Sequence, residues 1–175
     1  MNNQNVNENS QRNRQKLQVS DYVFEIDGKD ITKAEVEYEF IKLTSVSFKD
    51  GKKDATEYLS VISIDISGVD SNNSEAWFCF ELDMSLEQLN TYTDRPTDIT
   101  EYLSDCEAFI QKPNMDHSRE LDFYFPTNTI EDIYHNLTSI WVVKKDVNIF
   151  IFKVCVPSDG VFAFFKVNFN NEKGE

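Results

Sequence analysis

The sequence predicts an α+β fold that is mostly β, an antiparallel sandwich or barrel of about eight strands with two amphipathic helices packed on it. Three observations predict it. Apolar and polar residues alternate along many segments, turn sequences such as Asp-Gly separate these segments, and the regular strand–helix alternation of a parallel sheet does not occur. With 175 residues, 40% of them hydrophobic, the chain can bury the core of one domain.

Composition divides the chain into a polar arm over residues 1–17, a single β-rich domain over residues 18–171 and a polar tail over residues 172–175. The arm is rich in Asn and Gln and has no hydrophobic periodicity, which predicts flexibility. Its bases Arg12, Arg14 and Lys16 outnumber its one acid, Glu8. We therefore consider it a candidate docking arm for an acidic neighbouring subunit.

The first half of the domain is expected to form strands at residues 22–26, 35–48, 58–66 and 76–84. Asp27-Gly28 and Asp50-Gly51 are typical of tight turns, and the second predicts a hairpin. Ile41 and Leu43 interrupt the alternation of their strand, which predicts a bulge or a change of buried face.

Two helices are expected on either side of a strand at residues 121–125. Asp98 with Glu101, and Asn128 with Glu131, have the spacing of a capping box. Apolar residues recur at helical spacing after each box, first Ile99, Tyr102, Leu103, Cys106, Phe109 and Ile110, and then Ile130, Ile133, Tyr134, Leu137, Ile140 and Trp141. The last two residues are equally compatible with the start of a strand.

The last third is expected to form strands at residues 141–143, 147–156 and 161–169, joined by short turns. The middle strand is apolar on both faces, so it should be central and covered on both sides, by helices and by a second sheet or another subunit. The large apolar residues here are either core or an interface with a partner. The candidate apolar interface consists of Trp77, Phe150, Phe152, Phe162 and Phe164.

The charge is strongly acidic, at −14 overall, and it is concentrated. Residues 54–111 contain thirteen acids against the single base Arg95. Such a field disfavours nucleic-acid binding by the body and suits a basic protein partner, or it is a solvated face that maintains solubility. The candidate acidic partner surface consists of Asp65, Asp70, Glu75, Asp94, Asp98, Glu101 and Asp105.

No catalytic, metal or cofactor motif stands out, so the sequence predicts a protein that is not an enzyme and needs no cofactor. Asp116-His117-Ser118 holds triad residue types, but adjacent side chains cannot align as a catalytic triad. The only other histidine, His135, has no zinc-like spacing to a second ligand. The acidic loop at residues 70–75 lacks the glycine and distal acid of a calcium loop.

The expected location is the cytoplasm, or a virion if the protein is of phage origin. No apolar run has the length of a membrane helix, and the N-terminus does not resemble a signal peptide. Cys79, Cys106 and Cys155 lie far apart in apolar surroundings, which favours a reducing compartment.

Three functions remain open. The first is a structural or assembly protein that acts through protein–protein interfaces or self-association. A component of a phage virion or tail is one version of it. The second is an acidic inhibitor or immunity-type protein that binds a basic cleft, such as that of a nuclease. The third is a β-barrel that binds a small apolar ligand among its Phe and Tyr side chains.

Overall fold

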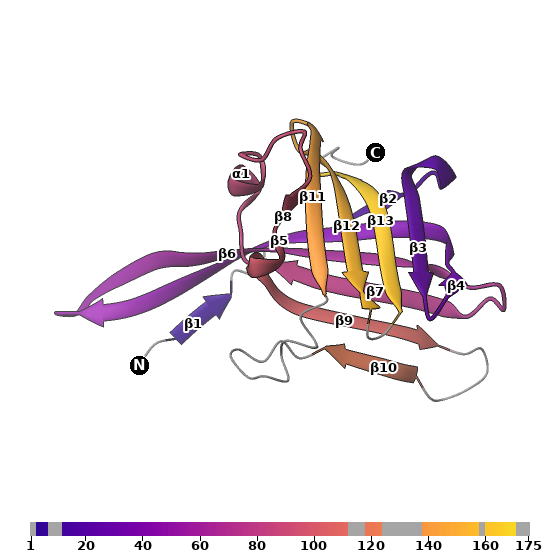
Figure 1. Ribbon diagram of the computed structural model, residues 1–175. Coiled ribbons are helices and arrows are strands. Elements are labelled where there is room, and N and C mark those ends of the chain that lie inside the picture. The colour runs from indigo at the N-terminus through magenta and orange to yellow at the C-terminus, as the bar shows by residue number, and fades with distance from the viewer. Residues whose placement is uncertain (1–2, 7–11, 112–117, 124–137, 158–159, 171–175) are drawn as a thin grey trace, which may run out of the picture.

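The computed structural model describes residues 3–6, 12–111, 118–123, 138–157 and 160–170, and it consists almost entirely of two antiparallel sheets (Figure 1). The seven-stranded sheet contains β1 (Asn3–Val6), β2 (Asn13–Lys16), β5 (Thr32–Lys49), β6 (Lys52–Val69), β7 (Glu75–Leu82), β9 (Leu103–Gln111) and β10 (Ser118–Phe123). The six-stranded sheet contains β3 (Tyr22–Ile26), β4 (Lys29–Asp30), β8 (Thr97–Asp98), β11 (Ser139–Asp146), β12 (Ile149–Val156) and β13 (Val161–Asn168). The prediction of a mostly β, antiparallel architecture is confirmed.

The strand order is β1-β5-β6-β7-β9-β10 in the larger sheet, with β2 also beside β5, and β4-β3-β13-β12-β11-β8 in the smaller one. Figure 1 shows the strands of one sheet crossing those of the other steeply. The strands β5 and β6 form a long hairpin whose end projects from the body (Figure 1). The smaller sheet therefore covers only part of the larger one.

The core lies between the inner faces of the two sheets and is rich in phenylalanine. Phe80 of β7 contacts Phe152 of β12 and Phe165 of β13, with ring centroids 6.0 and 6.2 Å apart. All three side chains are fully buried. Burial alternates residue by residue along β7, β12 and β13, as the two-residue period of a strand requires.

The expected turns and the irregularity in the long hairpin are present. Asp27-Gly28 joins β3 to β4 and Asp50-Gly51 joins β5 to β6, each with positive φ at both residues, the geometry of a type I′ turn. The register of β5 against β6 shifts between Leu43 and Thr44. Leu43 pairs with Leu59 and Thr44 with Glu57, so the extra residue of this β-bulge is Tyr58 on β6. Along β5 the break is a change of apolar face, since Ile41 and Leu43 are half-buried on the side that carries Glu37 and Glu39.

The helix predicted after Asp98 is wrong. Residues 98–110 form the end of β8, a 3-10 turn η2 (Thr100–Tyr102) and most of β9. The Asp98 carboxylate accepts a hydrogen bond from the Thr100 amide, 2.9 Å away, so the apparent cap stabilises a turn. Pairing with β7 on one side and β10 on the other then satisfies the β9 backbone, which outweighs the helical spacing of its apolar residues.

The second predicted helix falls mainly on residues 128–137, which lie outside the described part of the chain. Its last two positions, Ile140 and Trp141, belong to β11. The described residues also include a single helical turn α1 (Leu86–Leu89) and a 3-10 turn η1 (Val19–Asp21). Within the described residues, no helix has the length and hydropathy needed to cross a membrane.

Candidate protein-interaction faces

The outer face of the seven-stranded sheet carries carboxylates in cross-strand register. One row runs Glu37, Asp65, Cys79 and Glu107 across β5, β6, β7 and β9, and the adjacent row runs Glu39, Ser63, Glu81 and Asp105. We call the outer surface formed by Glu35, Glu37, Glu39, Asp65, Glu81, Asp105 and Glu107 the acidic face. The two-residue period of the four strands places these residues on one side of the sheet.

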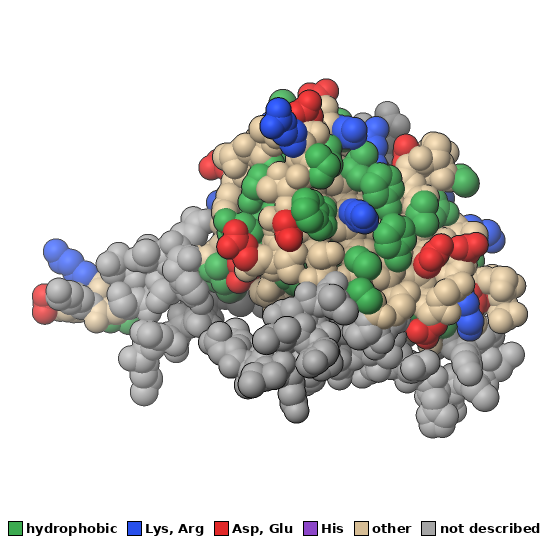
Figure 2. Space-filling view, in the orientation of Figure 1, with side chains coloured by type: hydrophobic (Ala, Val, Ile, Leu, Met, Phe, Trp, Pro, Cys, Tyr) green, Lys and Arg blue, Asp and Glu red, His purple; other side chains and the backbone are tan. Residues whose placement is uncertain are grey.

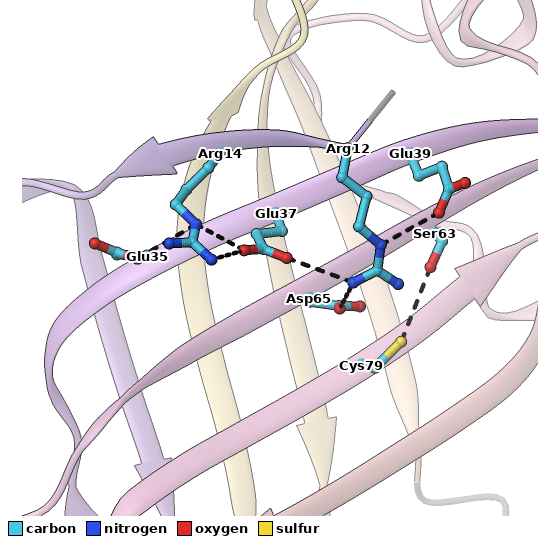
Figure 3. A network of polar contacts seen from close by, with 8 residues as sticks. All are labelled: Arg12, Arg14, Glu35, Glu37, Glu39, Ser63, Asp65 and Cys79. Carbon is cyan, nitrogen blue, oxygen red and sulfur yellow. Dashed lines mark hydrogen bonds and ion pairs between the residues drawn. The ribbon is translucent and has the colours of Figure 1, made fainter. Parts of the chain in front are cut away.

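Arg12 neutralises part of the acidic face from the N-terminal arm (Figure 3). Its guanidinium donates to Asp65 Oδ2 at 3.2 Å and lies 3.4 Å from carboxylate oxygens of both Glu37 and Glu39. The negative charge of Asp65 is the main cause of a raised pKa for Arg12, which burial partly opposes. One arginine therefore joins three carboxylates on two strands.

Arg14 makes a similar but more exposed contact. Its guanidinium donates to Glu37 through Nε, 2.6 Å from Oε1, and through Nη2, and it lies 3.7 Å from Glu35. The strand β2 holds both arginines above the sheet by pairing with residues 35–38 of β5. The described part of the predicted flexible arm is thus docked on its own domain, through backbone pairing and ion pairs.

Asp65 is the most enclosed carboxylate of the acidic face. Its side chain is 9% exposed, and Oδ1 is buried without a hydrogen-bond partner among the described atoms. Beside it, burial raises the pKa of the Cys79 thiol, and the neighbouring Asp65 raises it further. Cys79 is therefore a protonated thiol at neutral pH, with its sulfur 4.0 Å from the Ser63 hydroxyl.

Glu81 and Asp105, on β7 and β9, have no comparable compensation from a described cation. Glu81 lies directly opposite Asp105, and neither forms an ion pair with a described Lys or Arg. Burial raises the pKa of Glu81, and the nearby carboxylates, Asp105 first, raise it further. Like charges placed opposite each other in a sheet are destabilising, so this pair would gain from a cation.

The outer face of the six-stranded sheet carries a patch of apolar side chains, with Glu25 and Lys166 also on this side. Cross-strand pairing aligns Val23, Phe164, Lys153 and Trp141 across β3, β13, β12 and β11. Val23, Phe164 and Trp141 are 45%, 40% and 38% exposed. Figure 2 shows hydrophobic side chains gathered on this side of the molecule around a basic one. We call the surface of Val23, Trp141, Ile151, Lys153, Cys155, Phe162 and Phe164 the aromatic face.

The strand β12 is central, as expected, but it is covered on one side only by described residues. Phe150 and Phe152 are fully buried against the other sheet, whereas Ile151 is half-buried on the aromatic face. Of the two alternatives for the candidates Phe150 and Phe152, core or interface, their burial corresponds to core, because the alternation of β12 directs both toward the other sheet. Phe162 and Phe164 do lie on the aromatic face, and Trp77 is half-buried on the opposite sheet.

The seven acids selected from the sequence do not form one surface. Asp65 and Asp105 share the acidic face, whereas Asp98 belongs to the smaller sheet, opposite Trp141. Asp70 is buried in the β6–β7 turn, where its Oδ1 accepts from the amides of Asn72 and Ser74. Glu75 points to the same side of β7 as Glu81 but at the other end of the strand, whereas Asp94 and Glu101 are exposed on other elements.

The acidic face contains residues that the sequence selection missed. Glu35, Glu37 and Glu39 alternate with buried residues along β5, and Glu81 and Glu107 do so along β7 and β9. Alternation placed the first three on one face, but the register that sets them beside Asp65 and Arg12 could not be derived from one strand alone. The described His, Cys, Asp and Glu residues form no group of three or more that could hold a metal ion.

Comparison of this chain with protein-family models, with curated proteins and with solved structures finds no match.

Proposed function

We propose that this chain is a non-enzymatic structural or assembly protein that associates with a second copy of itself through the aromatic face. The observation that supports the proposal is the exposed row of Val23, Phe164 and Trp141 around Lys153. A contiguous exposed apolar patch is typical of a protein interaction site. A virion or tail component of a phage is one concrete version of such a protein.

A second copy suits this face because the row is self-complementary in charge. Beyond Trp141 the row continues to Asp98 on β8. A two-fold axis near Trp141 would stack the two tryptophans and set Lys153 of each copy opposite Asp98 of the other. The lysine would then meet a carboxylate within an otherwise apolar contact.

The test is sedimentation velocity on the full chain and on Trp141→Ser and Phe164→Ser. We expect the wild-type protein to self-associate with little dependence on salt, since the contact is mainly apolar, and either substitution to weaken this by about tenfold or more. Val147→Ser is the matched control, because Val147 is an exposed apolar residue in the β11–β12 turn, away from the aromatic face.

A wild-type chain that remains monomeric at about 100 μM would contradict the proposal. Equal effects of Val147→Ser and Phe164→Ser would contradict it as well, since the loss would then not be specific to the aromatic face. Circular dichroism of each variant shows whether the sandwich is retained.

A second function, binding of a basic protein cleft by an acidic inhibitor, is supported by the opposed pair of Glu81 and Asp105. A guanidinium or ammonium group placed between them would relieve their repulsion, as Arg12 does for the carboxylates around Asp65. The acidic face would then be the inhibitory surface.

This second function is tested with a deca-arginine peptide as the basic probe. Glu81→Gln with Asp105→Asn should weaken binding and lower its salt dependence. Glu75→Gln with Asp94→Asn should change it less, because it neutralises two exposed acids at the far end of β7 and in another segment. Equal losses from both pairs would show that only net charge attracts the peptide and would exclude a specific site.

A further inference from the structure

At the end of the β5–β6 hairpin, no described strand pairs with the outer edge of β6. The strand β7 pairs with β6 only over residues 62–69, so residues 52–61 have β5 as their single described neighbour strand. This part of β6 is the section of the hairpin that projects from the body in Figure 1. At about 3.3 Å per residue it would extend about 30 Å.

The open edge presents backbone groups at alternate residues. The two-residue turn Asp50-Gly51 makes Lys49 and Lys52 a hydrogen-bonded pair, and every second pair along the hairpin is then hydrogen-bonded too. Up to the bulge, Lys53, Ala55 and Glu57 occupy the alternate positions. Their N–H and C=O groups therefore point away from β5, toward the open edge.

The opposite edge of the same hairpin, formed by β5, pairs with an added strand. There, β1 adds an antiparallel strand to residues 43–46 of β5. The hairpin is thus extended by strand addition on its β5 side and left unextended on its β6 side among the described strands. A two-stranded ribbon gains stability from further strands, and an open edge is a template for pairing.

The charge of this segment favours a second copy of the chain as the added strand. Residues 49–57 hold three lysines and three acids, so this segment is neutral while the whole chain carries −14. An antiparallel pairing of β6 with β6 of a second copy, centred on Ala55, sets each Lys53 opposite Glu57 of the other copy. Opposite charges in such positions stabilise a sheet.

We propose that the open edges of β6 from two copies pair in this register and form one continuous sheet across a two-fold axis. Three hydrogen-bonded residue pairs would contribute about six backbone hydrogen bonds. Phe48, which is 66% exposed and pairs with Lys53 in the hairpin, would lie close to the joined edges. This contact lies outside the aromatic face, and together the two would link copies into chains longer than dimers.

The test uses the full chain with Trp141→Ser, which weakens association through the aromatic face. A failure of the aromatic-face contact is then distinguishable from a failure of the hairpin contact. In that background we expect a dimer whose affinity falls by about tenfold or more with either Lys53→Glu or Glu57→Lys, because each creates two like-charge pairs. Mixing the two charge variants should restore a dimer, since every Glu would then lie opposite a Lys.

Ala55→Pro provides an independent check. Proline removes the outward N–H at the centre of the proposed pairing while leaving the hydrogen bonds between β5 and β6 intact, so dimerisation should be lost. Ala55→Ser keeps the N–H and should retain the dimer. A monomer at about 100 μM before any hairpin substitution, or charge variants that do not recover on mixing, would overturn the proposal.

Discussion

The two outer faces of the sandwich differ in whether another part of the chain contacts their side chains. On the acidic face, Arg12 bridges carboxylates of two strands, and the deepest of them, Asp65, is 9% exposed. On the aromatic face, Phe164 and Trp141 remain about 40% exposed, and no described element lies over them. The chain thus covers part of one face with its own arm, whereas no described segment covers the other.

This difference indicates which face is available to a partner. A partner at the arginine-bound half of the acidic face would have to displace β2, whereas apolar surface on the aromatic face gains free energy on leaving water. Strands with the same alternating pattern produce both faces. The identity of the outward residues, rather than the fold, separates them.

The largest expected effect is on stability and compares the two sides of the six-stranded sheet. Phe152→Ala should lower the free energy of unfolding by about 3–5 kcal/mol, because Phe152 is fully buried among Phe80 and Phe165. Phe164→Ala should cost less than about 1 kcal/mol. Urea unfolding measures both, and equal costs would mean that Phe164 serves the core and not an interface.

A smaller effect tests the role of the arm on the acidic face. Arg12→Ala should destabilise the domain by about 1–2 kcal/mol, since it leaves the enclosed Asp65 carboxylate without its cation; the exposure of the arginine keeps the value modest. Arg14→Ala should cost less, because Glu35 and Glu37 are more exposed to water. Urea unfolding again measures the change.

The control for this prediction is the same substitution in an Asp65→Asn background. There, the cost of Arg12→Ala should shrink, because the buried charge is gone. An undiminished cost would show that the arm stabilises the sheet through backbone pairing alone.

The smallest effect concerns the opposed pair of Glu81 and Asp105 on the acidic face. Glu81→Gln should raise the free energy of unfolding by about 0.5 kcal/mol at neutral pH, because it removes the repulsion with Asp105. Since the folded state raises the pKa of Glu81, its ionised form opposes folding above that pKa. The advantage of glutamine should therefore shrink as the pH falls through the raised pKa toward the ordinary carboxyl range.

Urea unfolding at neutral and acidic pH measures this advantage, with Glu75→Gln as the control at an exposed end of β7. A glutamine that stabilises equally at both pH values would show that the repulsion with Asp105 is not its cause.

Strands and turns could be predicted from the sequence because their period and their turn residues are local. Phe78 and Phe80 alternate with outward residues, and Asp50-Gly51 is a turn sequence whatever surrounds it. The prediction of a helix after Asp98 was wrong because the spacing of the apolar residues of β9 fits both the helical period and the two-residue period of a strand. Only the neighbouring strands β7 and β10 decide between them.

The candidate sites were harder to predict because they depend on register between strands distant in sequence. Arg12 meets Asp65 across 53 residues, and the polar arm carries no apolar period that would reveal β2 as a strand. Phe164 and Phe165 look alike in the sequence, yet one is exposed and the other buried. The position of the second sheet decides which of the two side chains faces the core, and the sequence of one strand does not give that position.

The most direct test of the aromatic face as an assembly surface is the labelling rate of Cys155. This thiol is half-buried on that face, whereas Cys79 lies on the acidic face of the other sheet. Maleimide labelling, resolved by mass spectrometry, is compared in dilute and concentrated wild-type protein. We predict that concentration slows the labelling of Cys155 in the wild-type protein and slows it much less in Trp141→Ser. A self-associated protein that labels Cys155 as fast as the dilute monomer would contradict the proposal.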